Sequence, residues 1–220
     1  MAENLNSIPL TMSGATPKRE RRDAIENRER ILKTAVSLFA QHGVRQVSMA
    51  DIAKAAGVGK GTLYRRFANK GELCLALMDT QMRDFQNDTF LLMQQSAADG
   101  VPPLEQLCGF IDSLVHFTEA HSPLLCEVQR AGMLEGLSDE RIQLPHFWQH
   151  MTIASLLKTA VFHKQLSPII DIDYTADALL SPLKADIFRF QRTVRDFPLE
   201  RISAGLQLFI TGLSRIEILE

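Results

Sequence analysis

The 220-residue sequence has few cysteines and no long apolar run, and each absence excludes a class of protein. The three cysteines, Cys74, Cys108 and Cys126, are odd in number and form no CxxC pair, which argues against a disulfide framework and a zinc module. No stretch of eighteen apolar residues occurs, so we expect no membrane span. A basic start and an apolar signal-peptide core are also missing, so we expect a cytoplasmic protein.

Strand signals are missing as well, because the sequence shows neither alternating apolar and polar residues nor glycine-rich hairpin turns. Apolar residues instead recur at spacings of three and four, as they do between Ile31 and Phe39. This pattern predicts an all-α protein with about nine helices. Pro182 lies inside an apolar helical segment and is expected to kink it.

Charge is distributed unevenly along the chain although the net charge is only −2. Residues 18–70 contain thirteen Lys or Arg and five Asp or Glu, whereas residues 71–220 contain eleven and twenty. A basic first third joined to an acidic remainder favours a polyanion-binding module on a different kind of body.

Residues 48–67, SMADIAKAAGVGKGTLYRRF, carry the most informative pattern. Ser48 and Asp51 have the spacing of a capping box and predict a helix start, and Gly57 supplies the open conformation that ends this helix. A short basic helix then runs from about Lys60 to Phe67. Two helices joined by a tight turn, the second basic, are typical of a helix-turn-helix, whose second helix enters the major groove. Glycines at the start of that helix allow its backbone amides to approach phosphates.

Residues 28–78 resemble the N-terminal domain of the TetR/AcrR family of bacterial repressors, through RILKTAVSLFAQHG and VSMADIAKAAGVGKGTLYRRFANKGEL. The resemblance implies a three-helix DNA-binding domain followed by a helical domain for ligand binding and dimerisation. We expect a disordered tail over residues 1–22, the DNA-binding domain over 23–70 and the ligand-binding domain over 71–220. Gly71 departs from the acidic residue common in the family and is expected to fray the start of its helix.

The resemblance also assigns roles on the DNA. Ser48, Tyr64 and Lys70 match phosphate-contacting residues, and Gly61 lets the backbone approach. Lys60, Thr62 and Arg65 are the expected readers of base edges. Arg66 either contacts the backbone or is solvated, and the basic cluster between Lys18 and Arg22 is either a groove-binding arm or an unstructured one.

The acidic remainder is larger than DNA contact requires, so we expect a pocket for a small, largely apolar effector within it. Most of its apolar residues belong to the core, and Gln129 and Arg130 are the expected polar contributors. The residues predicted to line the pocket are Phe110, Leu114, Phe117, Gln129, Arg130, Met133, Trp148 and Met151.

The two last helices, about 175–194 and 198–218, are predicted to form a homodimer interface. The residues assigned to it are Leu179, Leu183, Ile187, Phe190, Ile202, Leu206, Phe209, Leu213 and Ile216. Two-fold symmetry then predicts a palindromic DNA operator.

Two other functions stay open from the residues alone. His146 and His150 lie four apart, as two metal ligands on a helix would, but the sequence supplies no third ligand nearby and no zinc-protease motif. A DNA-binding protein without a ligand is the second alternative. We favour a DNA-binding transcriptional regulator, most simply a repressor released by its effector, rather than an enzyme, with no cofactor or metal. Such a protein would associate with the bacterial nucleoid when bound to DNA.

Overall fold

A computed structural model describes residues 17–132 and 140–214, and over these residues the chain is helical without strands. Nine α-helices follow one another within these two ranges, which confirms the all-α prediction. They are α1 (Pro17–His42), α2 (Met49–Ala55), α3 (Lys60–Arg66), α4 (Lys70–Ala98), α5 (Pro103–Arg130), α6 (Glu140–Phe162), α7 (Ile172–Leu180), α8 (Ala185–Thr193) and α9 (Leu199–Leu213), with a 3₁₀ turn at Ser181–Leu183.

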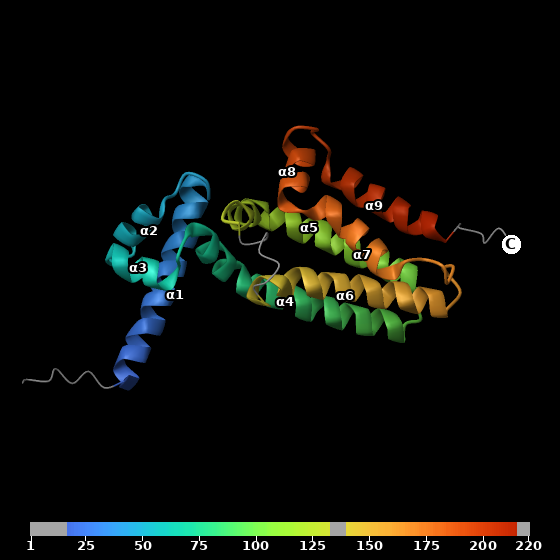
Figure 1. Ribbon diagram of the computed structural model, residues 1–220, viewed down its shortest axis with the longest axis horizontal. Helices are drawn as coiled ribbons and strands as arrows, with labels where there is room; N and C mark the ends of the chain where they lie inside the picture. The colour runs from blue at the N-terminus through green and yellow to red at the C-terminus, as the bar shows by residue number, and fades with distance from the viewer. Residues whose placement is uncertain (1–16, 133–139, 215–220) are drawn as a thin grey trace, which may run out of the picture.

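The helices form two lobes joined by α4 (Figure 1). The first lobe contains α1, α2, α3 and the start of α4, and the second contains the remaining described helices. A separate core fills the first lobe, where α2 packs against both α1 and α3 and the start of α4 packs against α1. Its fully buried side chains include Ile31, Ala35, Ile52, Leu63, Leu73 and Cys74.

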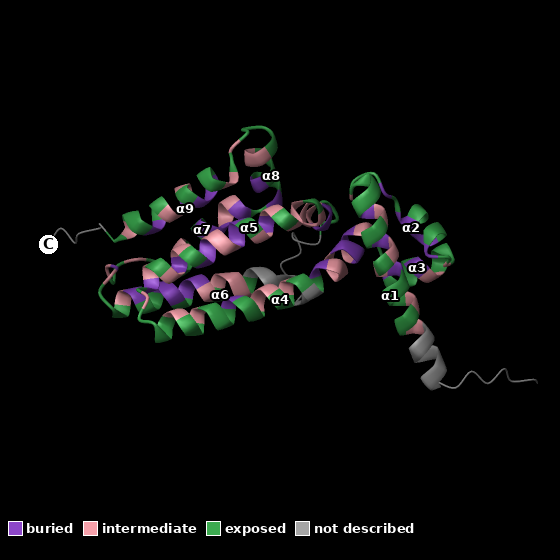
Figure 2. Ribbon diagram, turned by 180° about the vertical axis from the view of Figure 1, so that it is seen from behind, coloured by how far each residue is buried: buried purple, intermediate pink, exposed green. Residues whose placement is uncertain are grey.

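The second lobe is organised around α5, which contacts α4, α6, α8 and α9. Buried residues line the inner faces of these helices, as the purple segments in Figure 2 show. Phe188 of α8 is fully buried in this core. Arg192 fastens α8 to α5 as well, since its Nη2 and Nε lie 2.7 and 3.1 Å from Oε1 of Glu119.

The predicted helix starts of the first lobe are present. Ser48 caps α2, its Oγ accepting from the Asp51 amide at 3.2 Å while the Asp51 carboxylate accepts from the Ser48 amide at 3.0 Å. The Ser48 hydroxyl and then the Ser48 amide donate to the Asp51 carboxylate, and these two hydrogen bonds lower the pKa of Asp51. Gly57 follows α2 with φ +63°, a conformation that side chains disfavour. Asn69 caps α4 by accepting from the Glu72 amide at 2.9 Å.

Two local expectations differ from the structure. Residues 17–22 are helical, as the first turns of α1, whereas we expected them to belong to a disordered tail; residues 1–16 lie outside the described part. The helix expected over 175–194 is divided into α7, the 3₁₀ turn and α8, rather than kinked. Pro182 cannot donate a helical hydrogen bond, and Lys184 takes an extended ψ of 138° before α8 begins.

Candidate nucleic-acid interface

Helix α3 is anchored on one side and exposed on the other. Leu63 has no exposed surface and Phe67 has 3%, so these two side chains fix the helix on the first-lobe core. The opposite side presents the residues predicted for DNA contact: Lys60, Gly61, Tyr64, Arg65 and Arg66 are exposed, and Thr62 is half-buried. Arg65 Nη2 donates to Thr62 Oγ1 at 3.3 Å, so two of the expected base readers lie together.

Two glycines flank Lys60 at the start of α3. Gly59 is its N-cap and makes no side-chain cap bond. A Cβ at Gly59 or Gly61 would meet nothing within 4 Å, and neither glycine has a positive φ. Packing within the chain therefore does not require these glycines. An external surface that approaches the backbone, such as a phosphate strand, would account for both.

Ser48 is exposed, but its hydroxyl already takes part in the α2 cap, where it lies 2.6 Å from the Asp51 carboxylate. Its role as a phosphate contact would use the same oxygen. Lys18, Arg19, Arg21 and Arg22 lie on the first turns of α1, and the positions of their side chains are outside the described part of the structure.

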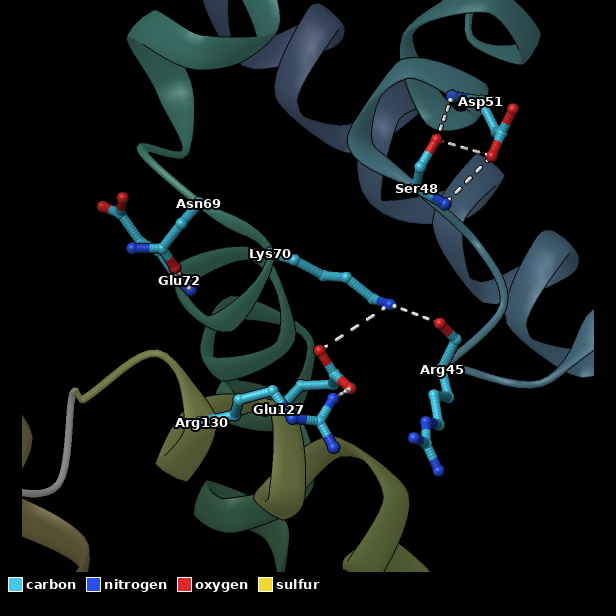
Figure 3. Close-up of polar contacts among 8 residues, drawn as sticks. All are labelled: Arg45, Ser48, Asp51, Asn69, Lys70, Glu72, Glu127 and Arg130. Carbon is cyan, nitrogen blue, oxygen red and sulfur yellow. Dashed lines mark hydrogen bonds and ion pairs between the residues drawn. The ribbon is translucent and has the colours of Figure 1, made fainter.

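Lys70 points toward the second lobe rather than outward (Figure 3). Its Nζ lies 3.7 Å from the Glu127 carboxylate of α5 and 3.4 Å from the Arg45 carbonyl oxygen. The side chains of Lys70 and Glu127 are 17% and 11% exposed. Arg130 contacts the same carboxylate. Sequence reasoning missed Glu127, because a carboxylate 57 positions away carries no local signal.

Beside this ion pair, the first turn of α4 packs directly on the last turn of α5. A Cβ at Gly71 would lie 2.4 Å from the Ala131 Cβ and 3.1 Å from the Glu127 carbonyl oxygen. Val128 of α5 is 1% exposed and belongs to the core of the first lobe. Burial, and then the nearby Glu127 carboxylate, raise the pKa of Cys74 on the adjoining turn to about 12. Gly71 is thus a close-contact position, although we expected it to weaken the helix start.

We predict that Gly71→Ala separates α4 from α5 and destabilises the protein by about 1–3 kcal/mol, the usual cost of overpacking. Urea denaturation followed by circular dichroism measures the change. Gly109→Ala is the matched control, because a Cβ there meets nothing within 4 Å, and it should stabilise α5 by up to about 1 kcal/mol. Adding Ala131→Gly to Gly71→Ala should restore part of the lost stability, because it removes the 2.4 Å approach but leaves the one to the Glu127 carbonyl oxygen. A double variant no more stable than Gly71→Ala would contradict the proposed contact.

The residues predicted to line one effector pocket are divided between two places. Phe110, Phe117 and Trp148 lie together around Phe85, with ring centroids 6.5, 4.5 and 5.9 Å from its own, and Leu114 is buried in the same core. Met151 is 46% exposed, and Met133 lies outside the described residues. Gln129 and Arg130 line a different cavity, between α5 and α8. The predicted set therefore combines an aromatic cluster at the core with two polar residues of a separate cavity, because helical spacing identifies apolar positions but does not say which of them line a cavity.

The predicted dimer residues are also divided. Leu179, Leu183, Ile202 and Leu206 are at most 9% exposed and belong to the core of their own chain, which corrects their assignment to a subunit interface. Leu213 packs against the same core, and Ile216 lies outside the described residues.

An exposed apolar face nevertheless exists on α8 and α9, which lie on the same side of α5 (Figure 1). Ile187, Phe190 and Phe209 of the predicted set are 40%, 49% and 70% exposed. Val194 and Leu208, which the sequence reading missed, are 67% and 72% exposed and extend this face. We call these five residues the α8–α9 face.

The histidine pair does not form a described metal site. His150 Nδ1 lies 2.9 Å from the Asp177 carboxylate and its Nε2 lies 3.5 Å from Asp173. The side chain of His146 lies outside the described part. Among the described side chains, no group of three or more His, Cys, Asp or Glu could hold a metal ion. No helix of the described chain is long and apolar enough to cross a bilayer.

Known proteins match both lobes. The family model for bacterial regulatory proteins of the tetR family matches residues 31–77. An HTH-type transcriptional regulator of Staphylococcus aureus (strain MRSA252) is 32% identical over 184 residues, covering 82% of this chain and 90% of that protein. A second, from S. aureus (strain bovine RF122 / ET3-1), is 31% identical over 183 residues with the same coverage.

Solved structures share the fold at lower identity. Thermus thermophilus FadR, a TetR-family repressor in complex with lauroyl-CoA, has a TM-score of 0.63 and 20% identity, covering 88% of this chain and 98% of that one. The fatty acid degradation regulator FadR of Bacillus halodurans has a TM-score of 0.57 and 19% identity, covering 84% and 97%. These matches extend the structural likeness from the first lobe to the helical second lobe.

Proposed function

Because the chain belongs to the tetR family of bacterial regulatory proteins, a family of DNA-binding transcriptional regulators, we propose that it is a homodimeric repressor that binds a palindromic operator through α3. The exposed face of α3, anchored from behind by Leu63 and carrying Lys60, Arg65 and Arg66, is the observation that supports this most directly. A short basic helix held in this way suits insertion into a major groove.

Side chains on this helix divide into two roles. Arg65, next to Thr62, is the expected reader of base edges, because a guanidinium can bond guanine bidentately. Tyr64 is 49% exposed and would contact a phosphate, which fixes the register without reading sequence. Lys70 would reach a phosphate only after leaving Glu127, so its contribution depends on the junction between the lobes.

We expect Arg65→Ala to weaken operator binding by about 1–3 kcal/mol and to relax the base preference at one position of the operator. Tyr64→Ala should instead lower the affinity for all DNA sequences similarly. The operator is first obtained by selection from a random duplex pool, and affinities are then measured by fluorescence anisotropy. Arg83→Ala, an exposed change on α4, is the control and should leave binding unchanged. If selection returns no enriched duplex, or if Arg65→Ala behaves like Arg83→Ala, the proposed interface is wrong.

We also propose that a small effector bound in the second lobe releases the operator. The Thermus thermophilus neighbour is in complex with lauroyl-CoA, a ligand with a long apolar chain, and the present chain shares its fold. Release requires the effector to bind the two states unequally, because equal affinity shifts no population. A reporter gene placed downstream of the selected operator tests both parts of this proposal. A repressor lowers the expression of the reporter, and a protein that needs no ligand leaves this expression unchanged when compounds are added.

The subunit contact of this proposed dimer would be the α8–α9 face. Its five apolar side chains are each at least 40% exposed in the single chain, and covering them by a second copy removes that surface from water. A two-fold axis through this face would place two α3 helices on one side of a duplex, at half-sites one helical turn apart or a multiple of it.

A further inference from the structure

A cavity of about 520 Å³ lies between the C-terminal end of α5 and α8, away from the apolar core. This volume is in the range of small-molecule sites. The residues that matter for its chemistry are Gln129 and Arg130 of α5, Asp186, Arg189 and Phe190 of α8, and Val194 just beyond that helix.

The floor of the cavity is held by hydrogen bonds between the two helices. Gln129 Oε1 accepts from the Asp186 amide at 3.0 Å, which fixes the start of α8 against the end of α5. The Asp186 carboxylate in turn accepts from the Ile187 amide at 2.9 Å. A hydrogen bond from the Gln129 side chain, and then those from the backbone, lower the pKa of Asp186, which favours its ionised form. Its Oδ1 is already hydrogen-bonded to the Ile187 amide.

Two guanidinium groups on the cavity wall are less constrained by hydrogen bonds than the Asp186 carboxylate. Arg189 is exposed, and no ion pair or hydrogen bond joins its side chain to another group in the described parts of the chain. Arg130 is half-exposed and contacts Glu127, a carboxylate that Lys70 also approaches. A carboxylate, phosphate or sulfonate could therefore be bound bidentately here. Phe190 and Val194, 49% and 67% exposed in the single chain, add an apolar wall that the cavity shares with the α8–α9 face.

The last turn of α5 has a second face, toward the DNA-binding lobe (Figure 3). Val128 is buried in the first-lobe core, Glu127 approaches Lys70, and Ala131 meets Gly71. Gln129 and Arg130, on the same turn, face the cavity. A ligand that attracts Arg130 away from Glu127 would therefore change a contact that the DNA-binding lobe shares.

We propose that the cavity between α5 and α8 is an effector site for a compound that joins an anionic group to an apolar body. Arg130 and Arg189 bind the anion, Phe190 and Val194 contact the apolar part, and Glu127 transmits occupancy to Lys70. The binding half of this inference is that the cavity binds such a compound, and it does not depend on the proposed function. The regulatory half is that occupancy changes DNA binding through Glu127, and it rests on the proposed function.

The binding half is tested by fluorescence titration with 8-anilinonaphthalene-1-sulfonate, an aromatic anion. N-phenyl-1-naphthylamine, which has nearly the same aromatic body without the sulfonate, is the matched probe. We expect the sulfonate to bind at least about tenfold more tightly, and Arg189→Ala to remove about that factor, the value of one charged hydrogen-bonding contact. Arg195→Ala, an exposed arginine outside the cavity, should leave binding unchanged.

Equal binding of the two probes, or equal effects of Arg189→Ala and Arg195→Ala, would overturn the site. So would an Arg189→Ala variant that retains sulfonate affinity but dissociates into monomers by analytical ultracentrifugation, since the cavity would then be a subunit contact.

The regulatory half is tested by operator anisotropy with the sulfonate at saturation. We expect the wild-type dissociation constant for DNA to rise severalfold. Glu127→Gln frees Arg130, so this variant should bind the sulfonate at least as tightly as the wild type while losing most of the response on DNA. Unchanged DNA affinity at saturation would overturn transmission through Glu127. If selection yields no operator, the proposed function fails, and the binding half is judged by the two probes alone.

Discussion

Phe188→Ala is expected to lower the free energy of unfolding by about 3–5 kcal/mol, the usual range for a fully buried phenylalanine. Phe188 has no exposed surface and lies in the core that α8 shares with α5 and α9. Truncation would leave a cavity that the short α8 cannot close, since Arg192 and Gln129 hold it at both ends. Urea denaturation at two protein concentrations measures the loss and separates folding from association.

Phe190→Ala is the matched control for this experiment. Phe190 lies two positions further along the same helix but is 49% exposed, so its truncation removes little buried area within the chain. We expect a loss below about 1 kcal/mol at a concentration where the protein is monomeric. Equal losses for the two variants would mean that α8 is oriented differently from the structure described here.

The paired change Leu208→Glu and Phe209→Glu is expected to convert the proposed dimer into a monomer and to lower operator affinity by about 100-fold or more, because each half-site would then be bound separately. The two side chains are 72% and 70% exposed on α9. Two buried carboxylates per subunit, repeated by symmetry, would face each other without partners. Analytical ultracentrifugation measures the oligomeric state, and anisotropy measures DNA binding.

Phe90→Glu is the control for the dimer experiment. Phe90 is 60% exposed on α4, outside the α8–α9 face, so the same substitution should leave both association and operator affinity unchanged. A wild-type protein that sediments as a monomer, or a Leu208→Glu and Phe209→Glu variant that still forms dimers, would show that the subunit contact lies elsewhere.

Local structure in the first lobe could be predicted from the sequence because its signals act over a few residues. Ser48 with Asp51, Gly57, and Asn69 with Glu72 each fix a helix end by bonds to neighbours three positions away or by a backbone angle. Leu63 and Phe67, four apart, predicted the buried side of α3 and therefore its exposed side. These features made the family resemblance specific as well.

The division between core, cavity and interface in the second lobe could not be predicted in the same way. Leu206 and Phe209 share an apolar character and a helix, yet one is 4% exposed and the other 70%. Arg130 and Phe110 were assigned to one pocket but lie in different surroundings. Helical periodicity says that a residue is on an apolar side, and it does not say which other helix covers that side.

The sequence by itself determined the helical class, the helix-turn-helix and the exposed basic face of α3, because these depend on caps, turns and spacing within a short segment. Only the tertiary structure decided that Lys70 approaches Glu127, that Gly71 is a contact with Ala131, and that two arginines line a cavity beside them. Each of these joins residues more than fifty positions apart. Such contacts arise from how α4, α5 and α8 pack, and the free energy of that packing is shared among many side chains. The sequence around either residue of a contact therefore does not identify its partner.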